Sequence, residues 1–201
     1  MRIGFVLECS PKGPDADIYP YLAKKFCPYF ETRKGDIVTL TNMENVMNDG
    51  PMTAKVLLEA GCSYVFIIWD RMPKWNGVGN CEVYRDRLLE GFNVLGIDSS
   101  RIILCCIKDM LESWMLGDGK AITEYFQSFN PTHRLDKFPD YKSSVEQSKP
   151  EEKLLRYNGK YNKFTDNFKI IKLIDNFDKI ANRNDSFKFF KESVEQICKT
   201  R

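Results

Sequence analysis

The chain lacks most of the short motifs that identify an enzyme class. It has one histidine, His133, and no Gly-x-Ser-x-Gly segment in 201 residues, which argues against a Ser-His-Asp hydrolase. It has neither a Gly-x-x-x-x-Gly-Lys-Ser/Thr loop nor a Gly-x-Gly-x-x-Gly segment, which argues against P-loop ATP hydrolysis and dinucleotide binding. A lone loop histidine is more often a surface or capping residue than a ligand, and we expect this of His133.

Long hydrophobic runs and paired cysteines are also missing. The longest apolar runs are far shorter than the ~18 residues that cross a bilayer, and the short apolar run before Glu8 does not resemble a signal peptide. No Cys-x-x-Cys occurs, so neither a zinc ribbon nor a thioredoxin motif is predicted, and Cys105 and Cys106 are interpreted as small hydrophobic residues of a strand. We therefore expect a reducing, cytoplasmic location and no membrane partner.

Charge is balanced overall but not along the chain. The formal net charge is +2, whereas residues 142–201 carry 14 Lys and Arg against 9 Asp and Glu. A basic tail of this kind is compatible with a polyanionic partner, but it is equally typical of a solvated helical surface.

Apolar segments that suit strands alternate with amphipathic segments that suit helices. This alternation predicts an α/β fold, with a mainly parallel sheet of four or slightly more strands flanked by helices. A polar stretch at residues 142–150 predicts a linker, so we expect an α/β domain over residues 1–140 and a helical extension over residues 141–201. The predicted strands are residues 1–8, 36–41, 63–70 and 101–107. The predicted helices are 18–30, 52–60, 81–95, one from about residue 110 that residues 121–129 either continue or follow as a separate helix, 168–180 and 185–197.

Acidic residues follow the predicted strands. Glu8 ends the first strand, Asp70 ends the third, and Glu112 and Asp118 follow the fourth. The carboxyl ends of parallel strands share one edge of the sheet, where ligands bind in this architecture. Carboxylates gathered there repel one another, and their oxygens suit Mg²⁺ or Mn²⁺, so the pattern predicts a divalent-metal site. Each residue alone has a simpler explanation, as a cap or first-turn acid of the next helix.

Basic and aromatic residues accompany these acids. Trp75 lies in a loop after Asp70 and is the better candidate for contacting a ligand, whereas Trp114 is expected to pack in the core. Several cations are placed to bind a phosphate, although each could instead pair with a neighbouring carboxylate. They are Lys12, Arg71, Lys74, Arg85 and Lys108.

These residues resemble those of TOPRIM-type domains. The similarity covers about residues 1–120 and includes a strand ending in Glu8, a strand ending in Asp70, and the segment Asp109-Met-Leu-Glu112-Ser-Trp-Met-Leu-Gly-Asp118. More narrowly, the chain is similar to small TOPRIM proteins of bacterial defence and mobile-element loci, and to the nuclease half of overcoming-lysogenization-defect nucleases. The resemblance implies a TOPRIM or Rossmann-like fold and metal-dependent phosphodiester hydrolysis. It implies Glu8 as general base or ligand, and Asp70, Glu112 and Asp118 as ligands.

The chain departs from this family pattern at two places. Asp70-Arg-Met72 stands where the family has Asp-x-Asp, and Glu8-Cys9 stands where it has Glu-Gly. Methionine is a poor Mg²⁺ ligand, so one ligand is missing or comes from elsewhere, with Glu82 and Asp86 as candidate substitutes.

Three hypotheses remain open from the sequence. The first is a metal-dependent nuclease acting on DNA or RNA, with a role in defence. The second is a catalytically inactive TOPRIM-like module that binds a partner, such as a protein encoded in the same operon, through its basic helical tail. The sequence leaves open whether the protein forms a homo-oligomer. The third is a phosphoacceptor receiver domain with Asp70 as the acceptor and Lys108 as its essential lysine. It is the weakest hypothesis, because receivers need two acids after the first strand and Glu8-Cys9 supplies one.

Overall fold

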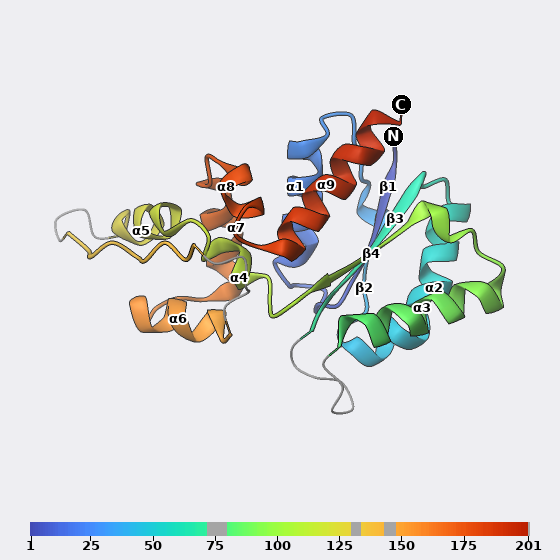
Figure 1. Ribbon diagram of the computed structural model, residues 1–201, viewed down its shortest axis with the longest axis horizontal. Coiled ribbons are helices and arrows are strands. Elements are labelled where there is room, and N and C mark those ends of the chain that lie inside the picture. Colours follow the sequence, from blue (N-terminus) through green and yellow to red (C-terminus); the bar gives the residue numbers. More distant parts are fainter. Residues whose placement is uncertain (72–79, 130–133, 143–147, 201) are drawn as a thin grey trace. The chain divides into compact units, whose positions relative to one another are not determined.

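The computed structural model describes residues 1–71, 80–129, 134–142 and 148–200 (Figure 1). The strands are β1 (Ile3–Leu7), β2 (Ile37–Thr39), β3 (Tyr64–Asp70) and β4 (Ile102–Ile107), with short 3-10 helices η1 (Lys34–Asp36) and η2 (Ser99–Arg101). The α-helices are α1 (Asp15–Phe26), α2 (Met43–Glu59), α3 (Cys81–Leu95), α4 (Glu112–Met115), α5 (Gly119–Gln127), α6 (Pro150–Tyr157), α7 (Lys163–Lys172), α8 (Phe177–Ala181) and α9 (Asp185–Lys199).

The chain forms two compact units. Unit 1 comprises residues 1–108 and 190–201, and unit 2 comprises residues 109–189. The boundary expected at residue 140 falls inside unit 2, and the expected division into a domain and an extension remains a prediction. In the part of the chain that the structure describes, no helix is both long and apolar enough to cross a membrane.

Unit 1 is built on an all-parallel sheet with the strand order β2-β1-β3-β4. The predicted α/β class, with four parallel strands flanked by helices, is confirmed. Strand β1 lies between β2 and β3, with Val6 opposite Val38 on one side and Ile67 on the other. The central strands β1 and β3 are almost entirely buried because helices cover both faces, which explains their continuous apolar sequence, whereas the edge strands β2 and β4 are partly exposed.

Helices α2 and α3 cover one face of this sheet (Figure 1). Alternate strand residues, among them Val6, Ile67 and Trp69, join the buried cluster on this face. The two helices pack closely where Gly91 of α3 meets Pro51 of α2. A Cβ atom on Gly91 would lie 2.7 Å from the Pro51 ring, so a larger residue would force the helices apart.

Helices α1 and α9 cover the other face (Figure 1). Phe5 and Phe66 stack with ring centroids 5.6 Å apart, and Phe190 of α9 lies 5.6 Å from Phe66. Tyr19 of α1 completes the contact at 5.9 Å from Phe190. The C-terminal helix is therefore part of the unit 1 core, and a second link holds it there: the disulfide between Cys27, which follows α1, and Cys198 in the last turn of α9.

Unit 2 is helical and has an aromatic core. Trp114 is 1% exposed, donates from Nε1 to the Ser186 hydroxyl at 2.9 Å, and lies edge-on to Phe187 at 5.0 Å. The Tyr157 ring of α6 contacts Phe126 and Phe138 at 5.9 and 5.0 Å. The expectation that Trp114 is a core residue is thus confirmed.

Several helix boundaries differ from those predicted. Helix α2 begins at Met43 rather than near residue 52, because the Asn42 side chain accepts a hydrogen bond from Asn45 N and caps the helix. The single helix predicted over residues 168–180 is wrong: it is two helices, and Asn176 caps the second by accepting from Lys179 N. Helix α6 was not predicted: it begins at Pro150, where the predicted linker ends, and no element was predicted for residues 151–157.

Candidate functional site

Glu8 and Asp70 lie side by side at the carboxyl edge of the unit 1 sheet. Glu8 follows β1 and Asp70 is the last residue of β3. The Asp70 backbone N–H donates to Glu8 Oε2 at 3.1 Å, and Glu8 N donates to Ile68 O at 3.1 Å. In this strand order the chain reverses its direction of winding between β1 and β3, and the crevice at that point is where open α/β sheets bind ligands.

The pKa of Glu8 is raised to about 7. Partial burial is the main cause, and the negative charge of Asp15 adds to it. Hydrogen bonds from the backbone N–H groups of Asp70 and Met43 act in the opposite direction, but they do not offset the burial. Glu8 therefore exchanges a proton near neutral pH, which suits a general acid or base.

Asp15 is a residue of this edge that the sequence did not indicate. It is the first residue of α1, which begins three residues before the start predicted at residue 18. Its charge contributes to the raised pKa of Glu8 and of the buried Cys9 thiol, whose pKa is raised chiefly by burial. The available signal was its place directly after Pro14, because proline followed by acids is typical of a helix start.

The backbone next to this edge is strained at Thr41. This β-branched residue has φ 71°, in the left-handed region that such residues rarely adopt. Its N–H donates to Cys9 O at 3.0 Å, one residue beyond Glu8. Strain of this kind costs about 1–3 kcal/mol and is concentrated at functional sites, so Thr41 is a second feature that distinguishes this edge.

Three of the predicted phosphate-binding cations follow strands that end here. Arg71 continues β3 and its N–H donates to Ile107 O at 2.7 Å. Lys108 follows β4, and Lys12 lies in the loop after β1; both are exposed. Lys74, Trp75 and His133 lie outside the described residues.

Glu112 is buried in unit 2 with partners of its own. It is 3% exposed, and its Oε1 accepts from Asn167 Nδ2 at 3.0 Å and from the Tyr161 hydroxyl at 3.4 Å. The carboxylate raises the pKa of the Tyr161 hydroxyl, although burial is the larger cause. These contacts give Glu112 a structural role within unit 2.

Asp118 is likewise engaged inside unit 2. It is 5% exposed and its carboxylate lies 2.9 Å from Lys179 Nζ. Lys179 also pairs with Asp140 at 3.1 Å, and Arg183 pairs with Asp140 at 3.2 Å. The predicted metal roles of Glu112 and Asp118 remain predictions, but both carboxylates already have protein partners.

The described part of the chain brings few potential metal ligands together. Across residues 1–71, 80–129, 134–142 and 148–200, no group of three or more His, Cys, Asp or Glu side chains could hold a metal ion. Glu8 and Asp70 are a smaller donor set, and the alternative ligands Glu82 and Asp86 are exposed on α3. Mg²⁺ commonly binds through one or two carboxylates, several waters and substrate phosphates, so the pair suits it only in that reduced form.

The structure contains two disulfide bonds that were not predicted from the sequence. Cys81, the first residue of α3, is bonded to Cys106 of β4, in addition to the Cys27–Cys198 disulfide. Cys106 therefore does not act as the small hydrophobic residue that was expected. Separations of 25 and 171 residues leave no short motif from which these pairs could be predicted.

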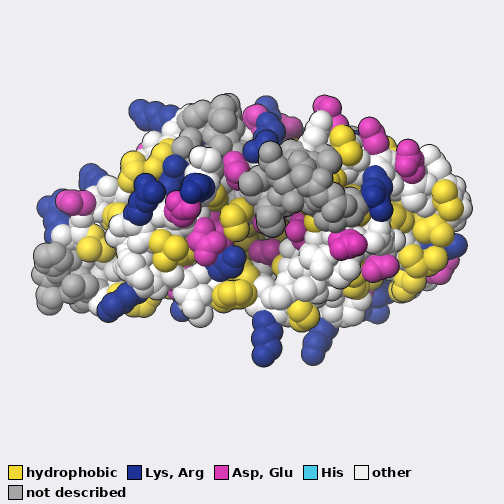
Figure 2. Space-filling model, turned by 90° about the horizontal axis from the view of Figure 1, so that it is seen from below, with side chains coloured by type: hydrophobic (Ala, Val, Ile, Leu, Met, Phe, Trp, Pro, Cys, Tyr) yellow, Lys and Arg dark blue, Asp and Glu magenta, His cyan; other side chains and the backbone are white. Residues whose placement is uncertain are grey.

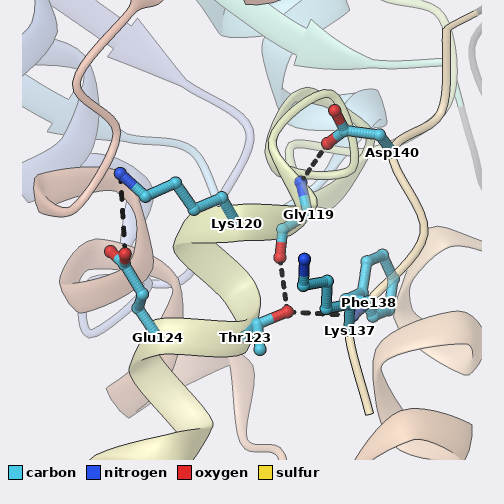
Figure 3. Close-up of a pocket in the computed structure, with 7 residues that line it drawn as sticks. All are labelled: Gly119, Lys120, Thr123, Glu124, Lys137, Phe138 and Asp140. Carbon is cyan, nitrogen blue, oxygen red and sulfur yellow. Dashed lines mark hydrogen bonds and ion pairs between the residues drawn. The ribbon is translucent and has the colours of Figure 1, made fainter.

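Unit 2 also has a pocket of about 580 Å³ at the start of α5 (Figure 3). Its polar groups bind one another. Asp140 accepts from Gly119 N at 2.8 Å, the Thr123 hydroxyl donates to Gly119 O at 2.7 Å, and Lys120 pairs with Glu124 at 3.6 Å (Figure 3). Such internally paired groups favour a structural role for these side chains over ligand binding.

Comparisons with known proteins found no matching family model, no matching curated protein and no matching solved structure. The TOPRIM resemblance therefore remains a prediction that depends on the motifs around Glu8, Asp70 and Glu112.

Proposed function

We propose that the protein is a divalent-metal-dependent nuclease that hydrolyses phosphodiester bonds at the Glu8 edge of unit 1. The observation that carries the proposal is Glu8 itself, which has a pKa of about 7 and is hydrogen-bonded to the Asp70 backbone at the ligand-binding crevice. The TOPRIM resemblance favours phosphodiesters over other substrates. A role in bacterial defence is part of the same proposal. The expected cytoplasmic location stays a prediction, and the two disulfides of the structure argue against it because disulfides are rare in a reducing compartment.

The chain's own groups would have distinct roles in this reaction. Glu8 would accept a proton from water, since a base with a pKa near the working pH is efficient. Arg71, Lys108 and Lys12 would attract the phosphate backbone to an edge that is otherwise acidic. Asp70 would hold Mg²⁺ or Mn²⁺ together with water and substrate phosphates, and Glu8 would join it as a ligand only in place of its role as base. The metal would supply positive charge to a phosphoryl oxygen and would lower the pKa of bound water.

A cleavage assay tests the proposal. Supercoiled plasmid, single-stranded DNA and RNA would each be incubated with the protein in Mg²⁺, in Mn²⁺ and in EDTA. We expect cutting of at least one nucleic acid with either metal and none in EDTA. Cutting that continues in EDTA, or no cutting of any of the three, would contradict the proposal.

A second candidate is a catalytically inactive TOPRIM-like module that binds a protein from the same operon. The internal partners of Glu112 and Asp118 favour it, because they remove two of the four expected ligands. Co-purification with the protein of a neighbouring gene, unchanged by Glu8→Gln, would support this candidate. Deletion of residues 150–201 is not a clean test, because α9 is part of the unit 1 core.

A further inference from the structure

The end of α6, the loop after it and α7 form a surface whose exposed charges are positive. Residues 153–174 contain six Lys and Arg and one acid, Asp166. Asp166 is only 7% exposed, and it accepts hydrogen bonds from the Tyr125 hydroxyl at 2.7 Å and from Asn162 N at 2.8 Å. We call residues 153–174 the basic α6–α7 surface. Both basic and acidic side chains lie on the face of the protein drawn in Figure 2.

Acidic neighbours neutralise only part of this surface. Glu151 lies 3.5 Å from Lys163, and Glu152 lies 3.5 Å from Arg156. Lys160, Lys169 and Lys172 are exposed, and none of the three has an ion pair within the described part of the chain. These three cations are therefore available to an anionic partner.

Aromatic side chains lie among the lysines on the outer side of α7. The helix buries Asp166, Asn167, Ile170 and Ile171, so the opposite side presents residues 164, 165, 168, 169 and 172. Phe164 is 54% exposed, although exposure of so large an apolar side chain is unfavourable in water. Lys172 Nζ lies 4.0 Å from the centre of the Phe168 ring, which places a cation directly beside an aromatic group.

We propose that the basic α6–α7 surface binds a single strand of nucleic acid. Lys160, Lys169 and Lys172 would contact phosphates, and an unpaired base would stack on Phe164, as in proteins that bind single strands. A duplex could use the lysines but not Phe164, since its base faces are stacked inside. This proposal names the substrate class of the proposed nuclease. It rests on the proposed function only in assuming that binding at this surface serves cleavage.

The test measures binding without turnover. Fluorescence anisotropy would follow a labelled oligo(dT) of about 20 nucleotides in EDTA, at salt concentrations between about 50 and 200 mM. The charge variant is Lys169→Glu with Lys172→Glu, and its matched control is Lys24→Glu with Lys25→Glu, two exposed lysines of α1. The stacking variant is Phe164→Ala, and its control is Phe129→Ala, another exposed phenylalanine of unit 2.

We expect the charge variant to bind roughly tenfold more weakly, or worse, at low salt. The slope of the logarithm of the binding constant against the logarithm of the salt concentration should become shallower by about 1.4, because each of the two lost phosphate contacts contributes about 0.7. Phe164→Ala should weaken binding by at least about fivefold and leave the salt dependence unchanged. Both controls should bind like the wild type.

Three results would overturn the proposal. They are wild-type affinity in the charge variant, equal or tighter binding of the matching duplex, and binding to phosphatidylserine vesicles but not to oligo(dT). Because the assay contains EDTA, single-strand binding without any cleavage in Mg²⁺ would uphold this surface while contradicting the nuclease proposal.

Discussion

Replacing Glu8 by Gln should make the protein more stable at pH 8 but not at pH 4. The Glu8 carboxyl has a pKa of about 7 in the folded protein against an ordinary value of 4.5, so folding favours its protonated form. The wild type therefore loses stability as the pH rises from about 4.5 to about 7, and Gln, which cannot ionise, does not. The full difference corresponds to at most about 3 kcal/mol, and partial solvent screening of the half-buried side chain reduces it.

Urea unfolding at pH 4, 6 and 8 in EDTA would measure this effect. Gln keeps an oxygen that can accept from Asp70 N–H, so the substitution changes charge with little change in shape. Glu59→Gln, an exposed residue of α2, is the matched control and should follow the wild type at every pH. Equal stability of Glu8→Gln and wild type at pH 8 would refute the argument that Glu8 is destabilised when ionised.

Three further substitutions test other parts of the structure by unfolding. Cys198→Ala should lower the free energy of unfolding by about 3–5 kcal/mol under oxidising conditions, because it opens a covalent loop of 171 residues; in dithiothreitol, which also reduces Cys81–Cys106 in both proteins, the difference between wild type and variant should disappear. Glu112→Ala should cost about 2 kcal/mol in EDTA, since the buried Asn167 amide loses its acceptor; an unchanged stability would contradict a structural role for Glu112. Thr41→Gly should raise stability by about 1 kcal/mol by relieving the positive φ, and a loss would show that its side chain contributes more than the strain.

The parts of the fold that were predicted correctly depend on local sequence. Continuous apolar runs located β1, β3 and β4. Helices α2 and α3 end close to the predicted residues 60 and 95, next to glycines with φ 97° at Gly61 and 62° at Gly96. The break between α7 and α8 was missed because the apolar spacing continues through it. Only the Asn176 cap, a single side-chain hydrogen bond, marks where the second helix begins.

The candidate site was predicted to the extent that sheet geometry determines it. Because β1 and β3 are parallel neighbours, Glu8 and Asp70 had to share an edge once both strands were located. Asp15 was missed because no periodicity relates the first turn of α1 to the end of β1. The partners of Glu112 were missed because they are 49 and 55 residues away, Tyr161 and Asn167, and only tertiary packing brings them together.

The most direct test of the account compares nucleic-acid cleavage by wild type, Glu8→Gln and Glu59→Gln in Mg²⁺ at pH 8. If Glu8 is the catalytic base, its variant should lose at least about 100-fold in rate, while Glu59→Gln keeps the wild-type rate. The unfolding measurements would show that the loss is not a folding defect, since Glu8→Gln is expected to be the more stable protein. Cleavage by Glu8→Gln at the wild-type rate would contradict the assignment of the active site to this edge.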